Sequence, residues 1–184
     1  MPEPQLLGRR RPRASATTVA FAAGGAPFRT WDDAGAGRGL THDITARRAR
    51  ALGARLPERT PEEAAEALLS LAGGHDLTLF EFYETDEAGH VRSFEHALDA
   101  LGRVDALLRA VVARRPPELS VVVASDHGNV EDLSARNHTL APVPVLGFGA
   151  AAARAGEVGD LTHIAPLLLT LAGASALPAR VAGG

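Results

Sequence analysis

The 184-residue sequence contains no cysteine, which excludes disulfides, thiolate nucleophiles and cysteine-based zinc sites. It also contains no lysine, because all 19 basic residues are arginine. Schiff-base catalysis by lysine and a phosphate-binding loop of the GxxxxGK[ST] type are therefore excluded. A metal site in this chain would have only oxygen and nitrogen donors.

Long hydrophobic runs are also missing, since no apolar stretch approaches the ~20 residues that a membrane-spanning helix needs. The net charge of −3 and the hydrophobic content of 46% are typical of a globular protein. They do not fit a disordered chain or one that coats nucleic acid. We therefore expect one soluble domain with neither a membrane nor a nucleic-acid partner.

The N-terminus allows two interpretations. Residues 1–13 contain three prolines and the run Arg9-Arg10-Arg11, and predict an irregular basic tail. The mildly apolar segment that follows, 14–26, would suit a twin-arginine export signal, but it carries polar Ser15 and Thr17. We therefore expect a cytoplasmic protein, with export as the alternative.

The spacing of hydrophobic residues and the positions of Gly, Pro and capping residues predict an alternation of helices and strands. The clearest signal is Thr60-Pro61-Glu62-Glu63, a capping box with proline at the first helical position. The apolar run 119–124 is typical of a strand buried on both faces, and a Gly- and Asp-rich loop is expected over 28–41. The order indicates a layered α/β domain, with helices expected at 14–23, 44–56, 61–72, 93–114 and 160–171, and strands at 76–83, 119–124 and 143–148.

Acidic residues and histidines gather next to these predicted strands. Asp126 and His127 directly follow the strand 119–124, while Asp86 and His90 lie just past 76–83. Ligands of open α/β sheets bind beyond the carboxyl ends of the strands. Asp86 and His90 are four residues apart, so a tight Gly-containing loop or one helical turn would let them converge on one ion. Such oxygen and nitrogen donors suit Zn or Mn.

His138 precedes its strand instead of following it. For His138 to reach the same edge of the sheet, the strand 143–148 is most simply antiparallel to the strand 119–124. His75, His96 and His163 show no such context, and we interpret them as structural or surface residues. Thr41-His42-Asp43 either touches a substrate or only precedes a helix.

Four segments carry a further signal: 85–90 (TDEAGH), 124–131 (ASDHGNVE), 138–144 (HTLAPVP) and 161–166 (LTHIAP). Together they resemble the alkaline phosphatase superfamily, and most closely its cofactor-independent phosphoglycerate mutase-like and phosphopentomutase-like metalloenzymes. The resemblance implies a three-layer alkaline phosphatase-like α/β sheet flanked by helices. It also implies that residues 14–184 form a partial metalloenzyme domain, in which 14–45 are a remnant of the family's cap or insert region.

The resemblance further implies two divalent metal ions, Zn or Mn with Mg as an alternative. Asp86, His90 and His138 would hold one ion, and Asp126 and His127 the other. The substrate class would be a small phosphorylated molecule, attacked by a Ser or Thr at a helix N-terminus. The substrate itself, the metal and the oligomeric state stay open.

The family's first strand, which bears a further metal-binding Asp and precedes the nucleophile, has no counterpart in residues 1–25. Ser15 and Thr17 have no strand before them. We therefore expect an N-terminally shortened member that lacks this strand and a recognisable nucleophile. Three functions remain: a phosphatase or phosphomutase-like core, a metal-binding remnant without turnover, or a Zn-dependent hydrolase that uses metal-bound water.

Overall fold

The computed structural model describes residues 15–25 and 27–174. The predicted basic tail at 1–13, including the arginine run of the export alternative, lies outside the described residues. Within the described part, no helix has both the length and the apolar character needed to cross a bilayer.

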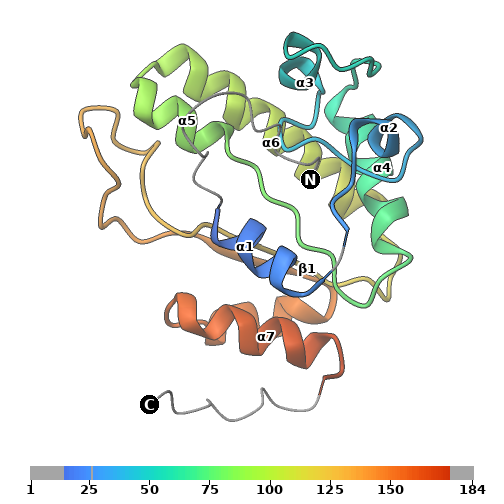
Figure 1. The fold of residues 1–184 in the computed structure, drawn as a ribbon. Helices are drawn as coiled ribbons and strands as arrows, with labels where there is room; N and C mark the ends of the chain where they lie inside the picture. Colours follow the sequence, from blue (N-terminus) through green and yellow to red (C-terminus); the bar gives the residue numbers. More distant parts are fainter. Residues whose placement is uncertain (1–14, 26, 175–184) are drawn as a thin grey trace.

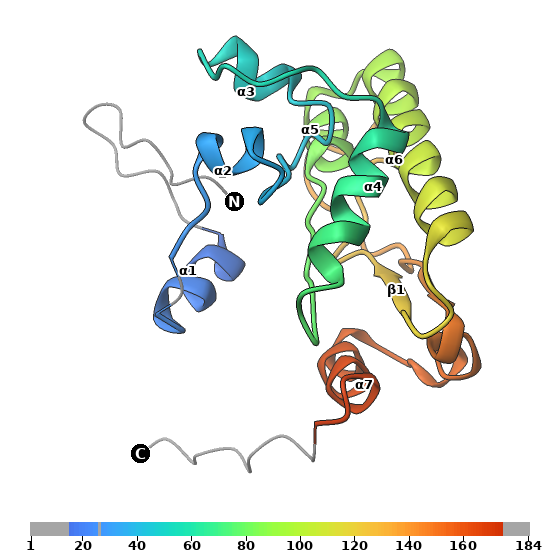
Figure 2. The ribbon, with the colours of Figure 1, turned by 90° about the vertical axis from the view of Figure 1, so that its right-hand side faces the viewer.

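Two long helices form the main helical layer. Helix α4 (Pro61–Ala72) starts with the predicted capping box, in which the Thr60 hydroxyl accepts from the Glu63 N–H and the Glu63 carboxylate accepts from the Thr60 N–H. Helix α6 (Phe94–Arg114) starts at Ser93, as its periodicity predicted. Figure 2 shows the two helices side by side. Their contact buries Ala64, Ala65, Leu107 and Val111 in one hydrophobic cluster.

The sheet in the described residues has two strands, β1 (Val121–Ala124) and β2 (Val145–Phe148). They pair antiparallel, with Val121 opposite Phe148 and Ala124 opposite Val145, which confirms the predicted strand direction. The prediction that the first of these strands is buried on both faces was wrong. Its valines are only partly buried and Ala124 is exposed, because a two-stranded sheet covers little of either strand.

The predicted strand at 76–83 was also wrong, because this segment forms no β-ladder. A strand exists only through hydrogen bonds to a neighbouring strand, and the described residues offer this segment none. The apolar character that suggested a strand is nevertheless used: Phe80 and Phe82 pack against the α4–α6 cluster. Figure 1 shows the segment as an irregular trace leading into α5 (Glu84–Val91).

Of the three short helices in the N-terminal part, one agrees with the prediction and two differ from it. Helix α1 (Ala16–Ala23) confirms the first predicted helix. The expected loop at 28–41 contains α2 (Trp31–Gly35), which starts with its own capping box between Thr30 and Asp33. The helix expected over 44–56 shrinks to α3 (Arg47–Ala51), because Ile44 and Ala46 have positive φ angles of 52° and 63°, outside the helical region.

The C-terminal part lies on the other side of the sheet. After β2, the chain forms three 3-10 turns: η1 (Gly149–Ala153), η2 (Ala155–Glu157) and η3 (Leu161–His163). The Asp160 carboxylate caps the third turn by accepting from the Thr162 N–H, and α7 (Ile164–Leu171) follows. Figures 1 and 2 both show the sheet between α7 on one side and α4 with α6 on the other. This layering is that of a partial alkaline phosphatase-like α/β fold.

Candidate metal centre

Helix α5 carries two of the predicted ligands. Of the two local arrangements that the spacing allowed, the structure has the helical one: Asp86 and His90 lie one turn apart on the same face of α5. The first turn contains Glu84, Asp86 and Glu87, and negative charge there is favourable because of the helix dipole.

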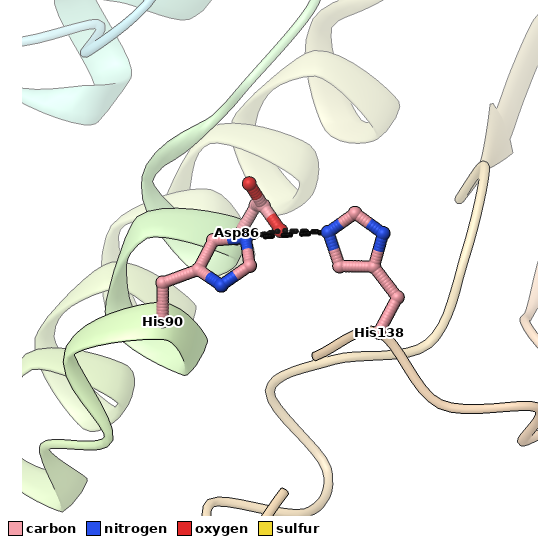
Figure 3. Close-up of side chains that lie close together, drawn as sticks. All are labelled: Asp86, His90 and His138. Carbon is pink, nitrogen blue, oxygen red and sulfur yellow. Dashed lines mark hydrogen bonds and ion pairs between the residues drawn. The ribbon is translucent and has the colours of Figure 1, made fainter. Parts of the chain in front are cut away.

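The third side chain, His138, comes from the long loop between β1 and β2. This loop closes on itself through an isolated antiparallel bridge between Gly128 and Thr139, in which the Thr139 N–H donates to the Gly128 carbonyl at 2.9 Å. The closure carries His138 back toward the carboxyl end of β1. Figure 3 shows its ring facing Asp86 and His90 across the gap between the loop and α5.

Asp86, His90 and His138, which we call the tripod, form a nearly equilateral triangle of donor atoms. Asp86 Oδ1 lies 3.4 Å from His90 Nε2 and 3.4 Å from His138 Nε2. The two Nε2 atoms are 3.2 Å apart. Two ligands bonded at ~2.0–2.1 Å to one tetrahedral ion are ~3.3 Å apart. The triangle therefore matches three corners of a zinc-type tetrahedron, and both imidazoles are exposed enough to leave the fourth corner open.

His127 lies against the tripod. Its ring stacks on that of His138, with centroids 3.5 Å apart and planes within 10°, and its Nε2 is 4.0 Å from Asp86 Oδ1. The buried Nδ1 of His127 has no hydrogen-bond partner. Asp126 lies beyond it, 86% exposed, with Oδ1 3.6 Å from His127 Nε2.

Asp126 and His127 thus supply two donors next to the tripod. A tightly held ion needs at least three protein ligands. Among residues 15–25 and 27–174, the tripod is the one group of three or more acidic or histidine side chains close enough to share an ion.

Comparison with known proteins identifies the family of the chain. A family model described as the Metalloenzyme superfamily matches residues 55–176, which include the tripod, Asp126 and His127. The chain belongs to the Metalloenzyme superfamily. The resemblance read from the metal motifs is thereby confirmed at family level. The segment 14–45, expected as a remnant of the cap region, lies outside the matched residues.

Curated relatives of this chain include 2,3-bisphosphoglycerate-independent phosphoglycerate mutases. The protein of Yersinia pestis (strain Pestoides F) is 30% identical over 125 residues, covering 62% of this chain and 24% of the relative. That of Cereibacter sphaeroides is 33% identical over 126 residues, covering 64% and 25%. That of Dinoroseobacter shibae is 32% identical over 124 residues, covering 62% and 25%.

The chain therefore spans about a quarter of the length of these relatives. The comparison with solved structures gives no significant match.

The remaining histidines of the chain lie outside the tripod. His75 Nδ1 lies 2.9 Å from the Leu71 carbonyl, and His163 Nδ1 accepts from the Gly159 N–H at 3.0 Å. His96 is exposed on α6. His42 is partly buried beside Tyr83, with ring centroids 5.6 Å apart, and burial lowers its pKa. The structure thus brings none of them into the metal group.

Two ion pairs hold α5 against its neighbours. Glu84 pairs with Arg103 of α6, and Glu87 pairs with Arg48 of α3. Burial raises the pKa of Glu84 even though Arg103 acts in the opposite direction. The helix that bears Asp86 and His90 is therefore fixed from two sides.

Sequence reasoning missed the residues that support the ligands. The carboxylate of Glu131 accepts from the Asn129 N–H and from the Thr139 hydroxyl, and so links the two sides of the loop between β1 and β2, called the ligand loop below. Asn129 itself contacts Asp86. Both follow directly on Asp126-His127 in the sequence, and this proximity was the available signal.

The hydroxyl groups that were considered as nucleophiles hydrogen-bond to groups other than the tripod side chains. Ser15 accepts from the Thr18 N–H at the start of α1, Thr17 donates to Glu81, and Ser125 donates to the His127 carbonyl. No serine or threonine hydroxyl of the described residues hydrogen-bonds to a tripod side chain.

Proposed function

We propose that this chain carries the metal centre of a phosphoryl-transfer enzyme of the phosphatase or phosphomutase type, acting on a small phosphorylated substrate. One observation carries the proposal: the tripod triangle has the edges of a tetrahedral ligand set, 3.2–3.4 Å. The relatives are named as phosphoglycerate mutases, which supports phosphoryl transfer as the type of reaction.

Each residue has an assigned part in this proposal. Asp86, His90 and His138 would hold a divalent ion, for which Zn and Mn are the favoured candidates and Mg the alternative. Asp126 and His127 would contribute to a second ion, with further ligands from elsewhere. Bound ions of this kind polarise a phosphoryl oxygen and stabilise the leaving oxygen. The stacked rings of His127 and His138 fix the spacing between the two donor sets.

Transfer requires that a P–O ester bond breaks while a new P–O bond forms to a nucleophilic oxygen that loses its proton. In this proposal the nucleophile is a hydroxyl or a water outside the contacts described above. A second function, metal binding without turnover, is favoured because no serine or threonine hydroxyl of the described residues hydrogen-bonds to a tripod side chain. The two functions share the tripod and differ only in turnover.

The test starts from the purified chain freed of metal with a chelator. Zn or Mn is titrated in by calorimetry, and hydrolysis of an aryl phosphate is followed with and without the ion. His138→Ala removes one corner of the tripod, while His96→Ala, an exposed histidine on α6, is the matched control. We expect His138→Ala to abolish binding and His96→Ala to retain it.

The hydrolysis assay then separates the two functions. Turnover that depends on the ion and on His138 supports the enzyme, whereas ion binding without turnover supports the binding function. A wild-type chain that binds neither Zn nor Mn would overturn both.

A further inference from the structure

Asn129 is a buried polar residue that touches the tripod. It is 5% exposed, one of few polar side chains buried to this degree in the described part of the chain. Its Nδ2 donates to the backbone carbonyl of Asp86 at 3.0 Å and also to Asp86 Oδ1. Asp86 Oδ1 is the same oxygen that faces the two tripod imidazoles. One amide therefore holds the metal-facing oxygen in place.

The contact requires an unusually close approach between α5 and the ligand loop. Gly89, on the next turn of α5, lies so near that an added Cβ would be 2.5 Å from Asn129 Cγ and closer still to its Oδ1. Real Cβ atoms do not come this close to other atoms. A glycine at this position of α5 is therefore what allows the Asn129 amide to reach Asp86.

Asn129 is itself fixed from the loop side. Its backbone N–H donates to Glu131 Oε2 at 2.6 Å, and Glu131 also accepts from the Thr139 hydroxyl, next to His138. Asn129 thus connects the two halves of the centre: Asp86 and His90 on α5, and His127 and His138 on the loop. Among the described residues, no other residue of this loop hydrogen-bonds to Asp86.

We infer that Asn129 is a positioning residue that fixes Asp86 Oδ1 relative to the loop histidines and thereby sets the affinity of the tripod for its ion. This inference rests on the proposed function, because it concerns the same metal centre. Hydrogen-bond partners of metal ligands commonly change affinity by ~10–100-fold when removed, because they orient the ligand before the ion arrives.

The experiment measures Zn affinity by competition with a chromophoric chelator. It compares the wild-type chain with Asn129→Ala, which removes the amide, and Asn129→Leu, which removes it while filling most of its volume. Gly89→Ala tests the same contact from the α5 side, although alanine is intrinsically better than glycine in a helix. Asn137→Ala is the matched control, since Asn137 is the other asparagine of the chain and is exposed in the same loop. Circular dichroism of the metal-free proteins identifies a temperature at which each variant is fully folded.

We expect Asn129→Ala, Asn129→Leu and Gly89→Ala to bind Zn ~10–100-fold more weakly than wild type while folded, and Asn137→Ala to bind like wild type. A folded Asn129 variant with wild-type affinity would overturn the inference. So would the failure of both Asn129 variants to fold, because Asn129 would then serve the fold and not the ion. A wild-type chain that binds no Zn or Mn at all would instead refute the proposed function on which the inference rests.

Discussion

Metal binding should stabilise the folded chain, and the size of the effect can be worked out. In the folded state Asp86 Oδ1, His90 Nε2 and His138 Nε2 already lie 3.2–3.4 Å apart, so little rearrangement is needed to bind an ion. The unfolded chain has no such preformed site. An ion that binds only the folded state adds about 2.7 kcal/mol when its free concentration is 100 times its Kd.

For a chain of this size, 1 kcal/mol shifts the melting temperature by roughly 2–4 °C. Saturating Zn or Mn should therefore raise the Tm by about 5–10 °C over the chelated protein. Thermal melts followed by circular dichroism measure the shift. His138→Ala should lose it, and His96→Ala should keep it. Superimposable melting curves of the chelated and metal-loaded wild-type chain would refute this reasoning.

Three further results are expected. Thr60→Ala should lower the free energy of unfolding by ~1 kcal/mol in denaturant titrations, because it removes the hydroxyl that caps α4; an unchanged midpoint would contradict this. Leu107→Ala should cost ~2–5 kcal/mol in the same assay, because Leu107 is 2% exposed in the α4–α6 cluster. Burial and the neighbouring Glu81 raise the pKa of Tyr83 from 10.0 to about 12, so its contribution to stability is full below pH 10 and is lost as the pH rises through 12. Tyr83 is the one tyrosine of the chain, and its phenolate absorbance should therefore titrate near 12 in the folded protein, whereas a midpoint near 10 would contradict the burial.

The sequence predicted those elements whose signals are local. The Thr60 capping box and the apolar periodicity of α6 act within one or two helical turns, so neighbouring residues were sufficient to define both helices. The capping box of Thr30 and Asp33 is an equally local signal for α2, in the segment where a loop was expected.

Elements that depend on distant partners could not be predicted in this way. The segment 76–83 has strand-like composition but no strand beside it in the described part of the chain, and composition does not reveal a neighbour. The shortening of α3 follows from positive φ angles at Ile44 and Ala46. Nothing in those residue types announces such angles, which a branched side chain such as that of Ile44 rarely adopts.

In the candidate metal centre, too, the features with a local sequence signal could be predicted and those that depend on distant contacts could not. The convergence of Asp86 and His90 followed from their spacing of four residues, and that of His138 from its place before β2, although the strand expected before Asp86 does not form. The supporting contacts did not follow from the sequence, because the Asn129 amide reaches Asp86 across 43 positions of sequence. Ligand types can be read from a motif, whereas the residues that orient them appear only once the chain is folded.

The central claim is that the tripod binds one divalent ion, and the most direct test is X-ray absorption spectroscopy of the Zn-loaded chain. Zn in the tripod should have oxygen and nitrogen ligands at ~2.0–2.1 Å, including two imidazoles, and His138→Ala, which no longer binds the ion, should show no imidazole ligand. A wild-type spectrum of fully hydrated Zn, or one that is identical in wild type and His138→Ala, would contradict the claim.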